Sequence, residues 1–153
     1  MNLERSKIIN LWYFRPDFKN TIPTTMRFNK IHHIAIICSD YERSKAFYTK
    51  TLGLTIKSEV FRAERNSWKV DLELNGDYVI ELFSYLNPPE RPSNPEASGL
   101  RHLAFEVDRV EDIHNELTAQ QIVCEAIRTD EFTQKKFFFT FDPDHLPIEF
   151  YEK

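Results

Sequence analysis

The feature that most constrains the fold of this chain is an internal repeat. The stretch from Leu100 to Val107 reads LRHLAFEV and resembles an earlier stretch, Ile31 to Ile37, which reads IHHIAII. Each places a His two residues before an Ala in a short apolar run of strand-like composition, and each is followed by an acidic turn and a segment of helical periodicity. Because self-similarity of this kind indicates a repeated structural unit, it sets the architecture before any single element does.

Each half of the repeat also contains a later apolar run with one glutamate in it. Glu81 lies in the run VIELF, 48 positions after His33, and Glu149 lies in PIEFY, 47 positions after His102. A carboxylate in such a run is costly to bury as an anion unless it is paired or bound to a metal. One strand histidine is ordinarily a polar residue at a rim, but two His and two Glu at matched positions indicate a functional site.

Both halves predict the element order βαβββ. In the first half we expect strands over 31–38, 54–61, 68–74 and 78–85 and a helix over 40–52. In the second half we expect strands over 100–107, 122–127, 136–141 and 148–151 and a helix over 109–120. Asp40 suits the N-cap of the first helix, Gly53 suits its C-terminal end, and Asn75-Gly76 suits a tight hairpin. We therefore predict an α+β fold in which two βαβββ modules form a curved, cupped mixed sheet with both helices outside.

The repeat also predicts the domain organisation. Module one covers residues 30–86, a linker with four prolines covers 87–99, and module two covers 100–153, so that 29–153 form a single domain. Residues 1–28 stand outside the repeat and carry none of its motifs. We expect them to be an N-terminal extension that contributes little to the functional site.

Composition and charge narrow the choice of partners. The chain has 153 residues and a net charge of −4, which gives no reason to expect nucleic acid or an anionic membrane as partner. No apolar run approaches the length of a membrane span, and no convincing signal peptide precedes the repeat, so a cytoplasmic location is expected. The two cysteines, Cys38 and Cys124, lie in apolar strand-like runs and are expected to be buried free thiols.

Alternation along the strands selects among the candidate histidines. His33 is equivalent to His102 in the repeat, whereas His32 is equivalent to Arg101 and is expected to point to the opposite, helix-covered face. Two imidazoles and two carboxylates suit a divalent first-row metal, namely Zn, Ni, Mn, Co or Fe, and the residue types alone do not choose among these. Such a metal can act as a Lewis acid while a carboxylate acts as general base.

Other polar and aromatic residues have an ordinary explanation beside the functional one. Glu106 shares a face with His102, but a glutamate at a strand end is more often solvated. Basic residues near two hairpins could hold an anionic substrate, although a charge cluster beside a turn is more often a solvated surface. These basic residues are Arg62, Arg65, Lys69, Lys135 and Lys136. Trp68 and the Phe run 137–139 are expected in the core.

The motifs HHIAI, YVIELFSY, GLRHLAFEV and DPDHLPIEFYE resemble those of the vicinal oxygen chelate superfamily, above all its glyoxalase I-like members, from about residue 30 to the C-terminus. The resemblance implies the glyoxalase/bleomycin resistance/dihydroxybiphenyl dioxygenase fold. It implies one divalent ion, with zinc or nickel favoured, held by the two histidines and two glutamates of the repeat: His33, Glu81, His102 and Glu149.

The same resemblance implies a reaction like that of lactoylglutathione lyase. A small oxo or hydroxy compound would react through a metal-bound enediolate, with Glu149 as the base and Glu81 as a second candidate. It also implies a homodimer whose modules pair either within one chain or between two chains. One departure is visible, because the family's last turn usually reads DPDG and here His145 replaces the glycine; His tolerates a positive φ better than most residues.

Three other functions remain open. An enzyme like methylmalonyl-CoA epimerase shares the fold and a similar ligand set. A ring-cleaving dioxygenase would use two His and one carboxylate on Fe(II), which would leave Glu81 surplus. A drug-binding protein of the bleomycin-resistance type keeps the fold without the metal, and the complete ligand set argues against it. In every case the partner is a small molecule whose identity the residues do not give.

Overall fold

The computed structural model describes residues 27–93 and 95–153, of which Ile31–Lys153 form one compact unit. The expected N-terminal extension, residues 1–28, lies almost entirely outside the described residues, so its role stays a prediction. Within the described part of the chain, no helix has the length and apolar character needed to cross a bilayer.

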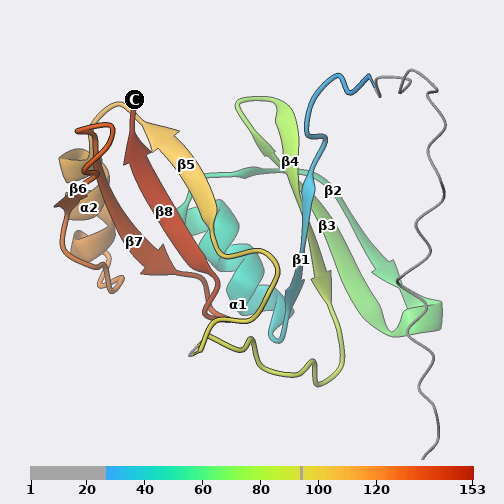
Figure 1. Ribbon diagram of the computed structural model, residues 1–153. Coiled ribbons are helices and arrows are strands. Elements are labelled where there is room, and N and C mark those ends of the chain that lie inside the picture. Colours follow the sequence, from blue (N-terminus) through green and yellow to red (C-terminus); the bar gives the residue numbers. More distant parts are fainter. Residues whose placement is uncertain (1–26, 94) are drawn as a thin grey trace, which may run out of the picture. The chain divides into compact units, whose positions relative to one another are not determined.

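Each module forms its own four-stranded mixed sheet (Figure 1). Module one consists of β1 (Ile34–Cys38), α1 (Tyr41–Ala46) continued by the π-helical turn η1 (Phe47–Thr51), β2 (Thr55–Arg62), the 3-10 turn η2 (Ala63–Arg65), β3 (Ser67–Leu74) and β4 (Asp77–Ser84). Module two consists of β5 (Leu103–Val107), α2 (Val110–Ala119), β6 (Arg128–Thr129), β7 (Lys136–Phe141) and β8 (Pro147–Glu152). The sheet orders are β1-β4-β3-β2 and β5-β8-β7-β6, and in each sheet only the first pair is parallel. The predicted α+β fold with repeated βαβββ order is confirmed.

Local sequence signals begin and end the elements of module one as expected. The Asp40 side chain accepts a hydrogen bond from the backbone N–H of Arg43 at 3.0 Å and so caps α1. Gly53 follows η1 with φ +77°, a left-handed conformation that glycine adopts without a steric penalty. Asn75 and Gly76 both have positive φ, as a tight turn between antiparallel strands requires, and they connect β3 to β4.

One hydrophobic core receives side chains from both modules. Along β4, Ile80 and Leu82 are buried, and along β8 the same is true of Ile148 and Phe150. They join buried residues of β1, β3, β7, α1, η1 and α2 in a single cluster. Because side chains alternate along a strand, burial of one face leaves the residues between these positions on the open face of each sheet.

A hydrogen-bond network, buried at Tyr48 and Asp142, joins the turn after β7 to the first strand and helix. The hydroxyl of Tyr48 donates to Asp142 at 2.8 Å, and the backbone N–H of Ser39 donates to Asp144 at 3.1 Å. The hydroxyls of Ser39 and Ser44 also donate to Asp144. We call these five residues the inter-module network. Burial raises the pKa of the Asp142 carboxyl, and the hydrogen bonds that it accepts oppose this rise.

The strand predicted over residues 122–127 is wrong. This segment makes only an isolated bridge between Cys124 and Thr140, and the short strand β6 comes after it. The side-chain hydroxyl of Thr140 donates to the backbone carbonyl of Val123 at 2.8 Å. In a regular antiparallel ladder, a backbone N–H of the neighbouring strand would donate to such a carbonyl. This segment therefore has the apolar composition typical of a strand but is not continuously paired with a neighbouring strand.

Two smaller predictions are confirmed. His145 takes the glycine position of the DPDH turn with φ +64°. Both cysteines are free as predicted, but only Cys38 is fully buried and Cys124 is half-buried. Burial together with the nearby Asp144 carboxylate raises the pKa of the Cys38 thiol to about 12. A thiol with so high a pKa stays protonated and unreactive at neutral pH.

Candidate metal centre

His33 and Glu81 lie together on the open face of the first sheet. His33 immediately precedes β1, and Ala35, two residues later, pairs with Glu81 across the parallel β1–β4 ladder. His33 Nε2 lies 3.3 Å from Glu81 Oε2. Glu81 lies on the face of β4 opposite the core, because its neighbours Ile80 and Leu82 are buried.

His102 and Glu149 repeat this arrangement on the second sheet. His102 immediately precedes β5, and Ala104 pairs with Glu149 across the parallel β5–β8 ladder. His102 Nε2 lies 3.1 Å from Glu149 Oε2, and the Glu149 side chain is only 13% exposed. Among the described residues, His102 Nδ1 is buried without a hydrogen-bond partner. The two His–Glu pairs are therefore equivalent in position and in geometry, as the sequence repeat indicates.

The four predicted ligands come together as two pairs. In residues 27–93 and 95–153, no three His, Cys, Asp or Glu side chains are grouped closely enough to hold a metal ion. Each pair offers one imidazole nitrogen and one carboxylate, which is half of the predicted donor set. A four-donor centre needs both pairs, and their meeting at one ion stays a prediction.

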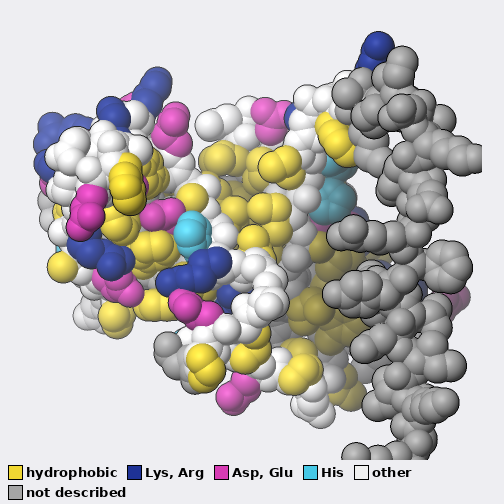
Figure 2. All heavy atoms as spheres, in the orientation of Figure 1, with side chains coloured by type: hydrophobic (Ala, Val, Ile, Leu, Met, Phe, Trp, Pro, Cys, Tyr) yellow, Lys and Arg dark blue, Asp and Glu magenta, His cyan; other side chains and the backbone are white. Residues whose placement is uncertain are grey.

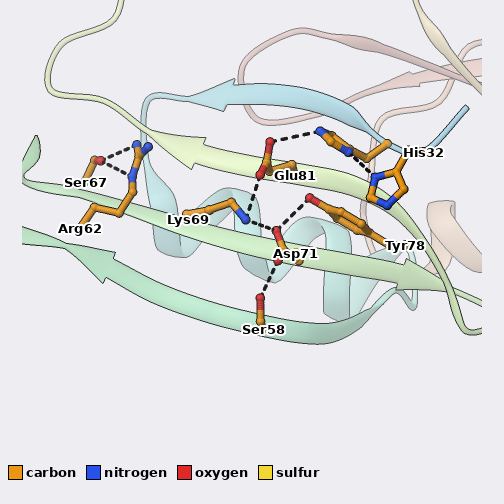
Figure 3. Close-up of polar contacts among 9 residues, drawn as sticks. His32, Ser58, Arg62, Ser67, Lys69, Asp71, Tyr78 and Glu81 are labelled. Atoms are coloured by element: carbon orange, nitrogen blue, oxygen red, sulfur yellow. Dashed lines mark hydrogen bonds and ion pairs between the residues drawn. The ribbon is translucent and has the colours of Figure 1, made fainter.

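Lys69, Asp71 and Tyr78 surround the first pair (Figure 3). Lys69 Nζ lies 2.8 Å from Glu81 Oε1 and 2.6 Å from Asp71 Oδ1, and the Tyr78 hydroxyl donates to Asp71 at 2.9 Å. Burial opposes the charged forms, but these hydrogen bonds together hold the pKa of Asp71 below its usual value and that of Lys69 above. Lys69, only 25% exposed, is therefore not the solvated surface charge that its place near a hairpin suggested.

His32 lies on the same side as His33, and the prediction that it points to the helix-covered face is wrong. The two Nδ1 atoms lie 2.8 Å apart, and the His32 ring meets Tyr78 edge-on with centroids 5.1 Å apart. The reason is that β1 begins at Ile34, so residues before it are not held in the alternation of a paired strand. His32 contacts His33 at Nδ1 and so leaves Nε2 directed at Glu81.

The second pair has an aromatic neighbour where the first pair has a charged one. Asp71 pairs with Glu81 across β3–β4, and Phe139 pairs with Glu149 across β7–β8, so Asp71 and Phe139 are equivalent positions. The ring centroids of Phe139 and His102 lie 5.4 Å apart. The two half-sites therefore share a frame of His and Glu but differ in what surrounds it.

The Phe run 137–139 is only partly in the core, contrary to expectation. Phe138 is fully buried, while Phe137 and Phe139 are half-buried on the opposite face. There the guanidinium of Arg128 stacks over both rings, with its carbon 4.9 Å from the Phe137 centroid and 5.5 Å from that of Phe139. These two rings are consequently available to line a site.

The other basic residues near the hairpins have structural or surface roles. Arg62 donates to the hydroxyl of Ser67 and stacks over Phe83 with its guanidinium carbon 4.5 Å from the ring centroid. Lys136 forms a surface ion pair with Glu111. The remaining candidates are exposed: Arg65, Lys135 and Glu106.

Sequence reasoning did not single out Asp71 or Tyr78. The available signal was the alternation KVDLE over residues 69–73, which places Lys69 and Asp71 on one face of a strand whose other face is apolar. Such a pattern is also typical of an ordinary solvated face, so only the register of the sheet brings these residues to Glu81.

The sequence of this chain matches one protein superfamily and is similar to two bacterial proteins. Residues 30–150 match the Glyoxalase/Bleomycin resistance protein/Dioxygenase superfamily. The chain is 59% identical over 124 residues to the uncharacterized protein YaeR of Escherichia coli (strain K12), covering 81% of this chain and 96% of YaeR. It is 58% identical over 128 residues to the uncharacterized protein YwkD of Bacillus subtilis (strain 168), covering 84% of this chain and all of YwkD.

A solved structure agrees with these sequence matches. The glyoxalase family protein from Enterococcus faecalis superimposes with a TM-score of 0.77 at 46% identity, covering 83% of this chain and 100% of that protein. The family match over residues 30–150 includes all four residues of the two His–Glu pairs. The chain thus belongs to the Glyoxalase/Bleomycin resistance protein/Dioxygenase superfamily.

Proposed function

We propose that this protein is a metal-dependent lyase or isomerase of the glyoxalase I-like type that acts on a small oxo or hydroxy compound. The observation that supports this most is the presence of two equivalent His–Glu pairs, with Nε2 to Oε2 distances of 3.3 and 3.1 Å, on the open faces of two equivalent sheets. Two imidazoles and two carboxylates are a donor set that suits a divalent first-row ion.

The surroundings of the glutamates are consistent with this donor set. The side chains of Glu81 and Glu149 are 17% and 13% exposed, and both lie in otherwise apolar runs. A carboxylate at such a position needs a compensating positive charge. Lys69 supplies one at Glu81, whereas among the described residues neither Lys nor Arg pairs with Glu149, whose neighbour is the imidazole of His102.

This difference also assigns the acid–base role. When bound, the divalent ion supplies Lewis-acid polarisation of a substrate oxygen. One oxygen of Glu81 is already taken by Lys69, while Glu149 Oε1 has no ion-pair partner in the described part of the chain. Glu149 is therefore the group proposed to accept and return the substrate proton, and Glu81 is proposed to serve only as a ligand.

A second copy of the chain is proposed to complete the centre. One chain groups the donors as two separate pairs, so the His33–Glu81 pair of one copy would meet the His102–Glu149 pair of the other. Strand β2 is exposed along nearly its whole length, with Val60 at 50% and Phe61 at 44%, and such apolar surface is suited to contact with a partner.

Mixed dimers test this arrangement. The double variants His33→Ala/Glu81→Gln and His102→Ala/Glu149→Gln should each bind little metal alone. When the two are co-expressed and the mixed dimer is isolated by two different tags, one of its two centres has all four native donors and should regain metal, measured by mass spectrometry. Mixed dimers that stay empty while the wild type is loaded would show that the donors meet within one chain.

Turnover tests the reaction class. The wild type, reconstituted in turn with Zn, Ni, Mn, Co and Fe, is assayed with the hemithioacetal of methylglyoxal and glutathione and with methylmalonyl-CoA. Glu149→Gln should retain more metal than His102→Ala yet lose turnover, because the amide still offers an oxygen but cannot take a proton. A Glu149→Gln variant with full activity would contradict the assigned base. Turnover of methylmalonyl-CoA alone would assign the epimerase reaction instead.

A further inference from the structure

A cavity of about 260 Å³ lies between the linker and the second sheet. Its wall includes Arg91 and Ser93 from the linker and Phe139 from β7. Because Phe139 also contacts the ring of His102, the cavity adjoins the second His–Glu pair. The linker is the one part of the described domain that has no counterpart in the repeat, so its contribution to the cavity is not explained by the duplicated fold.

Two polar groups of the cavity lack partners. Arg91 Nε and Ser93 Oγ are both buried without a hydrogen-bond partner among the described residues. The position of the guanidinium is nevertheless fixed, because Arg91 Nη2 donates to the backbone carbonyls of Leu100 and Arg101. A buried donor without an acceptor is unfavourable in a folded protein, and such a donor ordinarily bonds to an ordered water, an ion or a bound ligand.

The charges of the cavity leave Arg91 without a counter-ion. Five charged side chains line it, three arginines and two glutamates. Arg101 pairs with Glu96 at 2.9 Å and Arg128 pairs with Glu125 at 2.8 Å. Arg91 has no carboxylate partner in the part of the chain that the structure describes. Figure 2 shows basic and acidic side chains gathered beside a histidine on the face where the linker meets the start of β5.

We propose that this cavity is a binding subsite for an oxyanion group, a carboxylate or a phosphate, carried by a small ligand. Arg91 donates from Nε and Ser93 from its hydroxyl, and the positive charge of the guanidinium strengthens the hydrogen bond to an anionic oxygen. Assigning that group to the substrate of the metal centre rests on the proposed function. Binding of the anion itself does not, because every group that carries it belongs to the linker and the cavity wall.

The experiment uses the full chain after removal of metal with a chelator. The arginine Nε–H resonances are followed by NMR during titration with sodium phosphate, with sodium succinate and with sodium chloride at matched ionic strength. The resonance of Arg91, assigned by its loss in Arg91→Gln, should shift saturably with at least one oxyanion and not with chloride. Preference for phosphate identifies a phosphoryl group, and preference for succinate identifies a carboxylate.

Single substitutions distinguish binding at this subsite from nonspecific attraction of anions to positive charge on the protein. Affinities of the wild type and the variants are measured by isothermal titration calorimetry, because Arg91→Gln has no Arg91 resonance to follow. Arg91→Gln should weaken the binding at least tenfold. Ser93→Ala, which removes no hydrogen bond within the described residues, should weaken it several-fold without unfolding the linker. Arg109→Gln, at an exposed arginine before α2, should leave it unchanged. Equal affinities in the wild type and Arg91→Gln, or shifts that no oxyanion saturates, would overturn the proposal. Because the protein is metal-free, failure of the metal centre would leave this result unaffected.

Discussion

Lys69 Nζ lies 2.8 Å from Oε1 of Glu81, while Oε2 of the same carboxylate lies 3.3 Å from His33 Nε2. One carboxylate is thus shared between an ammonium and an imidazole. A divalent ion held by Glu81 would meet the charge of Lys69 at short range, and like charges at such separations repel strongly where water is partly excluded.

Replacing Lys69 by Met should therefore strengthen metal binding. Met keeps much of the length of the side chain and removes its charge, so the affinity for Zn should rise about tenfold, equivalent to about 1.4 kcal/mol. Competition with a chromogenic chelator measures it. Lys57→Met, in which a 52% exposed lysine loses its ion pair with Glu73, is the matched control and should change little. Weaker metal binding in Lys69→Met would show that Lys69 instead positions Glu81.

Replacing His32 by Ala should weaken metal binding without abolishing it. His32 contacts Nδ1 of His33, and removal of such an orienting partner typically reduces metal affinity about 10- to 100-fold. His33→Ala should lose more, because it removes the donor itself. The two affinities are compared by the same chelator competition. An unchanged affinity in His32→Ala would restore the sequence-based expectation that this residue is separate from the centre.

The contribution of Asp71 to the free energy of unfolding should depend on pH. Hydrogen bonds that outweigh burial hold the pKa of Asp71 below its usual value when folded. Its stabilising contribution is therefore complete above the unfolded pKa of about 3.9 and is lost as the pH falls through the folded value. Asp71→Asn should reduce the free energy of unfolding by about 1–2 kcal/mol at pH 7, and by less at pH 3.

Urea unfolding at both pH values measures this difference. Asp108→Asn, at an exposed position after β5, is the control and should show no such dependence. A loss in Asp71→Asn that is equally large at pH 3 and pH 7 would count against an ionised Asp71.

Replacing Tyr48 by Phe should destabilise the whole domain. The change removes the hydroxyl that donates to Asp142 Oδ2, while the backbone N–H groups of Asp144 and Leu146 still donate to Oδ1. One buried carboxylate oxygen then lacks a donor, which costs about 1–3 kcal/mol. The loss should appear as a lower Tm in a single cooperative transition. Tyr85→Phe, at a side chain that is 40% exposed, is the control. A Tm equal to that of the wild type would show that the other donors to Asp142 suffice.

Deleting residues 1–25 should leave the metal content of the protein unchanged. These residues precede the repeat and supply none of the four predicted ligands. Metal is measured in purified full-length and shortened protein by mass spectrometry. Loss of metal in the shortened protein, with its fold intact by circular dichroism, would make the extension part of the centre.

Local signals and the repeat were sufficient to predict most of the fold. The Asp40 cap, the Gly53 helix end and the Asn75-Gly76 turn each depend on conformations that one or two residues determine. The segment 122–127 was not predictable in this way, because its pairing depends on the Thr140 hydroxyl of a strand that comes later in the chain. Composition alone cannot distinguish a strand from an extended segment with side-chain hydrogen bonds.

The candidate site was predictable as far as the repeat reaches. Matched spacing identified each His–Glu pair, because each lies on two neighbouring parallel strands in the same register. The contribution of Asp71 was not predictable, because the register of β3 against β4 shifts between Leu72 and Glu73. Counting back from the Asn75-Gly76 turn without that bulge misaligns Asp71 by one residue, which would move it away from Glu81.

The inter-module network has a consequence for how the chain acquires its structure during synthesis. Tyr48 is separated from its partner Asp142 by 94 positions, and Ser39 is separated from Asp144 by 105. The partners of the first helix therefore leave the ribosome long after the helix itself, and contacts between such distant positions form slowly. A nascent first module can pair its own strands, but the Tyr48 hydroxyl lacks its partner until Asp142 has left the ribosome. Chains truncated before residue 142 should consequently depend on chaperones or be degraded, rather than persist as a shorter domain.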